Sequence, residues 1–152
     1  MFARAYLRAE TTPEVGAIIR DIHDSAADRF PVTWLHKVEL PNALQLYVFF
    51  GRQPHHERVT PEQAAIAHAT FREDCVEQKF LLPISLQEKS LTLRAQDLCL
   101  RHTAKHGFRT YDLLHVSSAL LLGCDPFITF DAQARRLAIL EGMDAPLMNP
   151  LR

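Results

Sequence analysis

The chain has 152 residues, 47% hydrophobic and 23% charged, and a formal net charge of −1 at pH 7. This length suits one domain with one core, and the composition is ordinary for a soluble globular protein. No apolar run reaches the roughly 18 residues that a membrane span needs, and the N-terminal residues lack the features of a secretory signal. Three widely spaced cysteines favour reduced thiols. We therefore expect a single cytoplasmic domain over residues 1–152.

The near-neutral charge gives no direct indication of nucleic-acid binding, which a strongly basic chain would give. If RNA is the substrate, a bound divalent cation and local arginines must offset the repulsion between protein and phosphate charges.

Two threonine–proline–glutamate sequences, beginning at Thr12 and Thr60, mark helix starts. Each combines a capping hydroxyl, a proline at the first helical position and an acid in the first turn. They predict helices over residues 12–28 and 60–80.

Between these helices, residues 30–33 are a possible short strand, and residues 34–51 carry apolar side chains at helical spacing. Pro41 lies inside that helical pattern, so we expect a kink or a late helix start there. Residues 53–59 read as a polar loop.

The second half of the chain continues the alternation of helices and short apolar strands. Glycines follow three of its predicted helices, as is common at helix C-termini. The expected elements are a short strand at 81–84, helices at 85–106 and 110–122, a strand at 126–130 and a helix at 131–141. The pattern favours an α/β sandwich around a small parallel sheet.

Acidic residues stand at informative places in this pattern. Asp112 lies in the first turn of a predicted helix, where the helix dipole favours an ionised carboxylate. Asp131 follows a predicted strand, and strand alternation would place Thr129 on the same side. Glu39, with Asn42 three residues later, adds a third acid.

Clustered carboxylates repel one another unless a cation joins them, and hard oxygen ligands suit Mg²⁺ or Mn²⁺. Such ions activate water and stabilise the leaving oxygen of a phosphodiester, so an acidic cluster is typical of a nuclease. Taken singly, each acid has a simpler interpretation: Asp112 as a helix-start charge, Asp131 as an N-cap and Glu39 as a solvated helix residue. His102 and His106, four residues apart, could share a metal, but a solvated helix face is the commoner case.

The run RTYDLLHVSSALLLGCDPFITFDAQARRLAILEGM, over residues 109–143, resembles the C-terminal half of PIN-domain proteins, especially VapC-type toxins. In that family an arginine, an aspartate that opens a helix and a threonine–phenylalanine–aspartate strand end recur together. Weaker similarity extends to residues 38–44, which look like the family's glutamate helix, and to residues 2–20.

The resemblance implies a PIN-like fold, bound Mg²⁺ or Mn²⁺ and endonucleolytic cleavage of RNA. It also implies a small antitoxin protein as partner and a homodimer. Carried over residue by residue, the metal-site acids are Glu39, Asp112 and Asp131, and Thr129 supports the site by hydrogen bonding. The resemblance also matches recurrent positions near the site, which could support it or contact RNA, to Asn42, Arg109 and His115.

One departure from the family pattern concerns the first strand, which in relatives ends in an aspartate. Here the chain starts at Met1 apparently just after that point, and no acid precedes Glu10. We therefore expect the N-terminal strand and its aspartate to be missing, through a start codon assigned too late or a truncated form. The alternatives to a ribonuclease are a PIN-like module that binds antitoxin or RNA without cleaving, and a metal-free structural or dimerisation domain.

Overall fold

The computed structural model describes residues 3, 6–7, 29–56 and 58–147. The chain divides into two compact units, Met1–Ile84 (unit 1) and Ser85–Arg152 (unit 2). Buried hydrophobic side chains likewise form one cluster in each unit. The expectation of a single domain over residues 1–152 stays a prediction. The helix expected over residues 12–28 lies outside the described residues.

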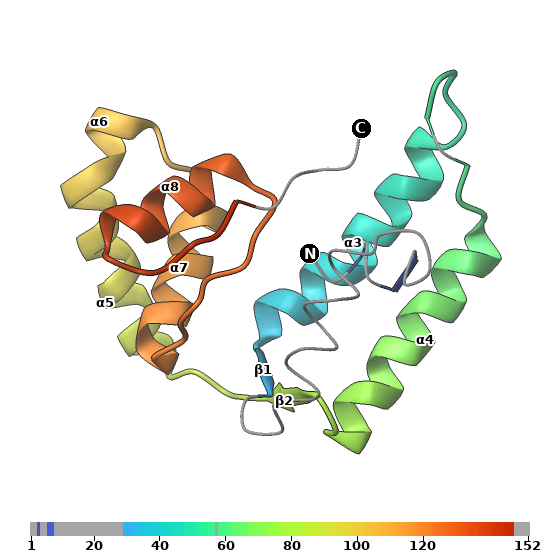
Figure 1. The fold of residues 1–152 in the computed structure, drawn as a ribbon, viewed down its shortest axis with the longest axis horizontal. Coiled ribbons are helices and arrows are strands. Elements are labelled where there is room, and N and C mark those ends of the chain that lie inside the picture. The colour runs from blue at the N-terminus through green and yellow to red at the C-terminus, as the bar shows by residue number, and fades with distance from the viewer. Residues whose placement is uncertain (1–2, 4–5, 8–28, 57, 148–152) are drawn as a thin grey trace. The chain divides into compact units, whose positions relative to one another are not determined.

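Unit 1 contains a two-stranded parallel sheet and two long helices (Figure 1). Over residues 29–84 as the structure describes them, its elements in chain order are β1 (Phe30–Val32), α3 (Trp34–Phe50), α4 (Pro61–Glu77) and β2 (Leu81–Pro83). The strands pair in register, with Phe30 opposite Leu81 and Val32 opposite Pro83. Because parallel strands need a crossover connection, the helix pair between them follows directly from this topology.

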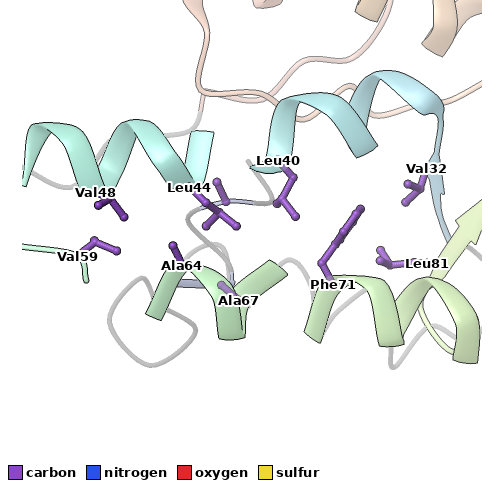
Figure 2. Close-up of a cluster of buried hydrophobic side chains, with 10 residues drawn as sticks. Val32, Leu40, Leu44, Val48, Val59, Ala64, Ala67, Phe71 and Leu81 are labelled. Atoms are coloured by element: carbon purple, nitrogen blue, oxygen red, sulfur yellow. The ribbon is translucent and has the colours of Figure 1, made fainter. Parts of the chain in front are cut away.

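The core of unit 1 lies between α3 and α4. Figure 2 shows the side chains of the two helices pointing toward one another, with Val32 and Leu81 of the strands at one end and Val48 facing Val59 at the other. Leu44, at the centre of α3, is 1% exposed. Burial of this kind stabilises a fold by about 25 cal/mol per Å² of apolar surface.

Unit 2 is helical. Its elements are α5 (Glu88–Leu98), the π-helical segment η1 (Cys99–Thr103), α6 (Ala104–His106), α7 (Thr110–Leu122) and α8 (Ala132–Leu140). Helix α7 packs against both α5 and α8 (Figure 1). Leu98, Val116 and Leu137, from α5, α7 and α8, are fully buried in the shared cluster.

Two sequence-based expectations about unit 1 helices needed adjustment. Helix α3 starts at Trp34 and runs through Pro41, so a late start is wrong. Pro41 removes only one backbone donor, while Leu40 and Leu44 on either side of it are buried, so packing outweighs the local cost. Helix α4 ends at Glu77, three residues before the expected end, because Gln78 takes the left-handed conformation.

In unit 2 the strand expected over residues 126–130 is wrong, since the structure has no regular element there. A strand needs a neighbour that supplies a ladder of backbone hydrogen bonds. Instead, the N–H of Phe127 donates to the carbonyl of Asp144 at 2.7 Å, and the N–H of Asp144 donates to Oδ1 of Asp125 at 2.9 Å. The segment is therefore held as a loop by the residues that follow α8.

The helix expected over residues 85–106 is present but interrupted. It begins at Glu88, and its last part passes through the π turn of η1 before ending at Gly107, whose φ is 71°. The fold class is confirmed at its coarser level, as helices with a small parallel sheet in an α/β chain.

Candidate functional site

Asp112 is a charged residue that the fold keeps nearly buried, with 6% of its surface exposed. It lies in the first turn of α7, where its Oδ2 accepts a hydrogen bond of 2.9 Å from the backbone N–H of Arg109. That bond satisfies a donor that the helix leaves without an internal partner, and the helix dipole favours the negative charge. The helix-start interpretation of Asp112 is therefore confirmed, and the carboxylate is held in a fixed place.

Asp131 caps α8. Its Oδ1 accepts from the backbone N–H groups of Gln133 at 2.7 Å and Ala134 at 3.1 Å, which confirms the N-cap interpretation. Thr129 belongs to the same arrangement, because its Oγ1 accepts from the N–H of Asp131 at 3.0 Å. The hydrogen bond, not strand alternation, brings Thr129 and Asp131 together.

These two aspartates stand at the N-termini of two helices that pack on one another. The loop that connects α7 to α8 runs back along α7 before α8 begins (Figure 1). Asp112 is buried and Asp131 is exposed, so their surroundings differ although both occupy a helix N-terminus.

Glu39 and Asn42 lie on α3 in unit 1, whereas the other predicted site residues lie in unit 2. Glu39 is half-buried, and Asn42, three residues further along the helix, is exposed. Spacing of three places both on one side of α3.

The remaining predicted residues flank Asp112. The side chain of Arg109 is exposed, and its backbone supplies the N–H that Asp112 accepts. His115 follows Asp112 by about one helical turn and is half-buried. The guanidinium of Arg109 is exposed to solvent, and exposed arginines are common phosphate-contacting residues.

A charged network in unit 2 was not expected from the sequence. Arg101 donates to both carboxylate oxygens of Glu141, at 2.7 and 2.8 Å, and also to Asp97. His102 Nε2 lies 2.7 Å from Oε1 of Glu141, whose side chain is 9% exposed. The bonds from Arg101 hold the pKa of Glu141 below its ordinary value.

This network joins η1 to Glu141, the residue that follows α8. The spacing of four between Asp97 and Arg101 is visible in the sequence, but the partner forty residues away is not. His102 and His106 have ring centroids 6.3 Å apart, with the ring of Phe108 near both. The imidazole of His102 therefore contacts the carboxylate of Glu141 and does not lie on a solvated face.

Within the described ranges, no three histidine, cysteine, aspartate or glutamate side chains are grouped so that they could hold a metal ion. Among the same residues, no helix has the length and apolar character needed to cross a bilayer.

Comparison with known proteins gives no relative for this chain: no protein-family profile matches it, and no curated protein or solved structure does either.

Proposed function

We propose that this chain is a PIN-like endoribonuclease dependent on Mg²⁺ or Mn²⁺, and the toxin of a VapBC-type toxin–antitoxin pair. The proposal starts from the resemblance of residues 109–143 to such toxins. Its structural support is that the backbone N–H of Arg109 holds the nearly buried carboxylate of Asp112 in a fixed place at the N-terminus of α7, as a ligand site requires.

Asp131 is the second acid of the proposed site, and Thr129 positions it through the bond to its backbone N–H. The resemblance assigns Glu39, on α3, as a further metal-site acid. Mg²⁺ commonly keeps several waters and takes only one or two carboxylates together with substrate phosphates, so the proposal does not require a cage of three protein ligands. When bound, such an ion activates water and stabilises the leaving oxygen of the phosphodiester.

We propose supporting or RNA-binding roles for Arg109, Asn42 and His115. The exposed guanidinium of Arg109 would contact phosphate beside Asp112. A small antitoxin protein and a homodimeric state follow from the same resemblance. Light scattering of the purified chain, alone and with the product of a neighbouring small gene, tests both.

The decisive experiment is cleavage of a structured RNA with Mg²⁺ or Mn²⁺, with EDTA as a control. Asp112→Asn and Asp131→Asn are the sharpest variants, because an asparagine oxygen still accepts the capping hydrogen bonds while the charge is lost. Glu39→Gln tests the third acid. Asp144→Asn is the matched control, since Asp144 is an exposed carboxylate of unit 2 whose contact with Asp125 uses its backbone.

Cleavage that disappears in EDTA and in the Asp112 and Asp131 variants, but persists in Asp144→Asn, would support the proposal. Cleavage that persists in EDTA would refute a metal-dependent mechanism. RNA or antitoxin binding without any cleavage would favour the alternative, a PIN-like module that binds but does not cut.

Metal binding can be measured separately from RNA cleavage. An ion at one hundred times its dissociation constant stabilises the folded state by about 2.7 kcal/mol, which a thermal unfolding experiment with Mn²⁺ would detect. We expect Asp112→Asn to abolish that stabilisation and Asp144→Asn to retain it.

A further inference from the structure

Helix α5, with the η1 turn that continues it, carries leucines on two opposite sides. Leu91 and Leu98, seven residues apart, are buried, with 4% and 0% of their surface exposed. Leu93 and Leu100, also seven residues apart, are 57% and 84% exposed. A spacing of seven is close to two helical turns, so each pair lies on one side of the helix. A helix with apolar side chains on opposite sides is typical of one that packs on both.

Charged residues flank the outer leucines symmetrically. Lys89 lies four residues before Leu93 and Asp97 four residues after it, and both are exposed. Among the described residues, the ammonium of Lys89 has no ion-paired carboxylate. Asp97 bonds to Arg101 through Oδ2, which leaves its Oδ1 available to a further donor. The outer side of α5 therefore offers one cation and one anion at equal distances from Leu93.

This charge pattern is complementary to itself in one direction only. Two α5 helices that run antiparallel and cross at Leu93 bring Lys89 of each copy level with Asp97 of the other. The same arrangement sets Leu100 of one copy level with the half-buried Leu86 of the other. Parallel helices in register would instead place like charges level with one another. A two-fold interface uses the same surface on both copies, so a self-complementary surface favours a second copy of this chain as the occupant.

The surface around Leu93 is also shaped to receive a side chain. In paired helices a knob from one helix enters a hole formed by four residues of the other. For Leu93 of the second copy that hole is formed by residues 89, 92, 93 and 96. A shallow hollow on this side of the helix is lined by Gln87, Glu88, Lys89, Thr92 and Leu93.

We propose that two copies of this chain associate through α5, antiparallel about a two-fold axis at Leu93. The pairing assigns a surface to the homodimer of the proposed function and rests on that part of it alone, not on RNA cleavage. One helix from each copy makes a small interface, so we expect a dimer that dissociates on dilution.

The test is sedimentation velocity of the full chain over a wide range of concentration, in which the wild type should shift from monomer to dimer. Leu93→Glu sets two carboxylates against each other at the axis and should weaken the dimer about tenfold or more. Ile66→Glu is the matched control, since Ile66 is an apolar residue of α4 with 66% of its surface exposed. It should leave the association unchanged.

Charge reversal tests the antiparallel arrangement itself. Lys89→Glu and Asp97→Lys, each alone, turn two attractive contacts of the dimer into repulsive ones and should weaken it about tenfold at low salt. In an equimolar mixture of these two variants both contacts are attractive again, so the mixed dimer should regain the affinity of the wild type. Circular dichroism of each variant checks that the helices remain.

A wild type that stays monomeric at the highest concentration would overturn the inference, as would a dimer that Leu93→Glu leaves intact. A mixture that associates no more tightly than its components would also overturn it, because an antitoxin surface or a parallel pair has no such requirement. A dimer that depends on Leu93 but cleaves no RNA would leave the surface assigned and refute the nuclease. Cleavage by a chain that stays monomeric would do the reverse.

Discussion

At the scale of single residues, the two aspartates at helix N-termini combine a structural role with the chemical role proposed above. Asp112 accepts from the N–H of Arg109, and Asp131 accepts from two N–H groups of α8. Capping alone accounts for each carboxylate, as the simplest interpretation of the sequence predicted. Capping also fixes each carboxylate in space, which a ligand site requires.

Substitution of Asp112 should separate its structural contribution from its charge. Asp112→Ala leaves the N–H of Arg109 without its acceptor and should lower the free energy of unfolding by about 1–2 kcal/mol. Asp112→Asn retains an acceptor and should cost clearly less. Urea unfolding of both variants measures the difference, and equal losses would contradict the capping role.

Glu141 should make stability depend on pH in the acid range. Its folded-state pKa is lowered, first by hydrogen bonds from Arg101, so its contribution is present above the unfolded value of 4.5 and is lost as pH falls through the folded value. At pH 7 we expect Glu141→Gln to cost about 1–2 kcal/mol, because Glu141 is largely buried but Arg101 is partly solvated.

The difference between wild type and Glu141→Gln should therefore shrink as the pH is lowered below 4.5. Glu88→Gln, an exposed acid in the first turn of α5, is a suitable comparison. A difference for Glu141→Gln that stayed constant with pH would show that the ion pair does not contribute.

At the scale of elements, helix ends follow local backbone chemistry. Helices α4 and α7 are both followed by a capping residue in the left-handed region, Gln78 with φ 52° and Gly123 with φ 65°. Glycine adopts this conformation without steric cost, whereas other residues lose about 1–2 kcal/mol. Thr60, by contrast, starts α4 with a complete capping arrangement, since its hydroxyl accepts from the N–H of Gln63.

A reciprocal pair of substitutions tests this difference between helix ends. Gln78→Gly should stabilise the protein by about 0.5–1 kcal/mol, and Gly123→Gln should destabilise it by about 1 kcal/mol. An added Cβ at Gly123 would meet no atom within 4 Å, so the cost there is one of backbone conformation alone. Thermal unfolding measures both, and shifts of the same sign would contradict the explanation.

At the scale of the whole molecule, the buried apolar side chains form two clusters, one in each unit. Leu44 is central to the first and Leu137 to the second, and both are essentially without exposure. Removing such a side chain leaves a cavity whose cost adds to the lost transfer free energy.

Leu44→Ala and Leu137→Ala should each lower the free energy of unfolding by about 2–5 kcal/mol. Because the sequence predicts one domain over residues 1–152, both should shift a single shared transition. Hydrogen exchange and denaturant unfolding test this together. Two transitions, each moved by only one of the substitutions, would show instead that the units unfold independently.

Features that depend on neighbouring residues could be predicted from the amino-acid sequence. Thr60 and the proline after it placed the start of α4, the glycines placed the ends of α6, α7 and α8, and the aspartates were recognisable as helix-start residues. Hydrophobic spacing likewise identified α3, β1 and β2. These features are local, so a few neighbouring residues are enough to predict them.

Features that depend on residues far apart in the chain became clear from the packing of the folded protein. Residues 126–130 have the composition of a strand, yet the bond from Phe127 to Asp144 makes them a loop. The bidentate contact between Arg101 and Glu141 likewise joins residues that are forty positions apart and meet only after folding. The composition of a segment gives its propensity for helix or strand. The packing of the whole chain decides which partner satisfies its hydrogen bonds or charges.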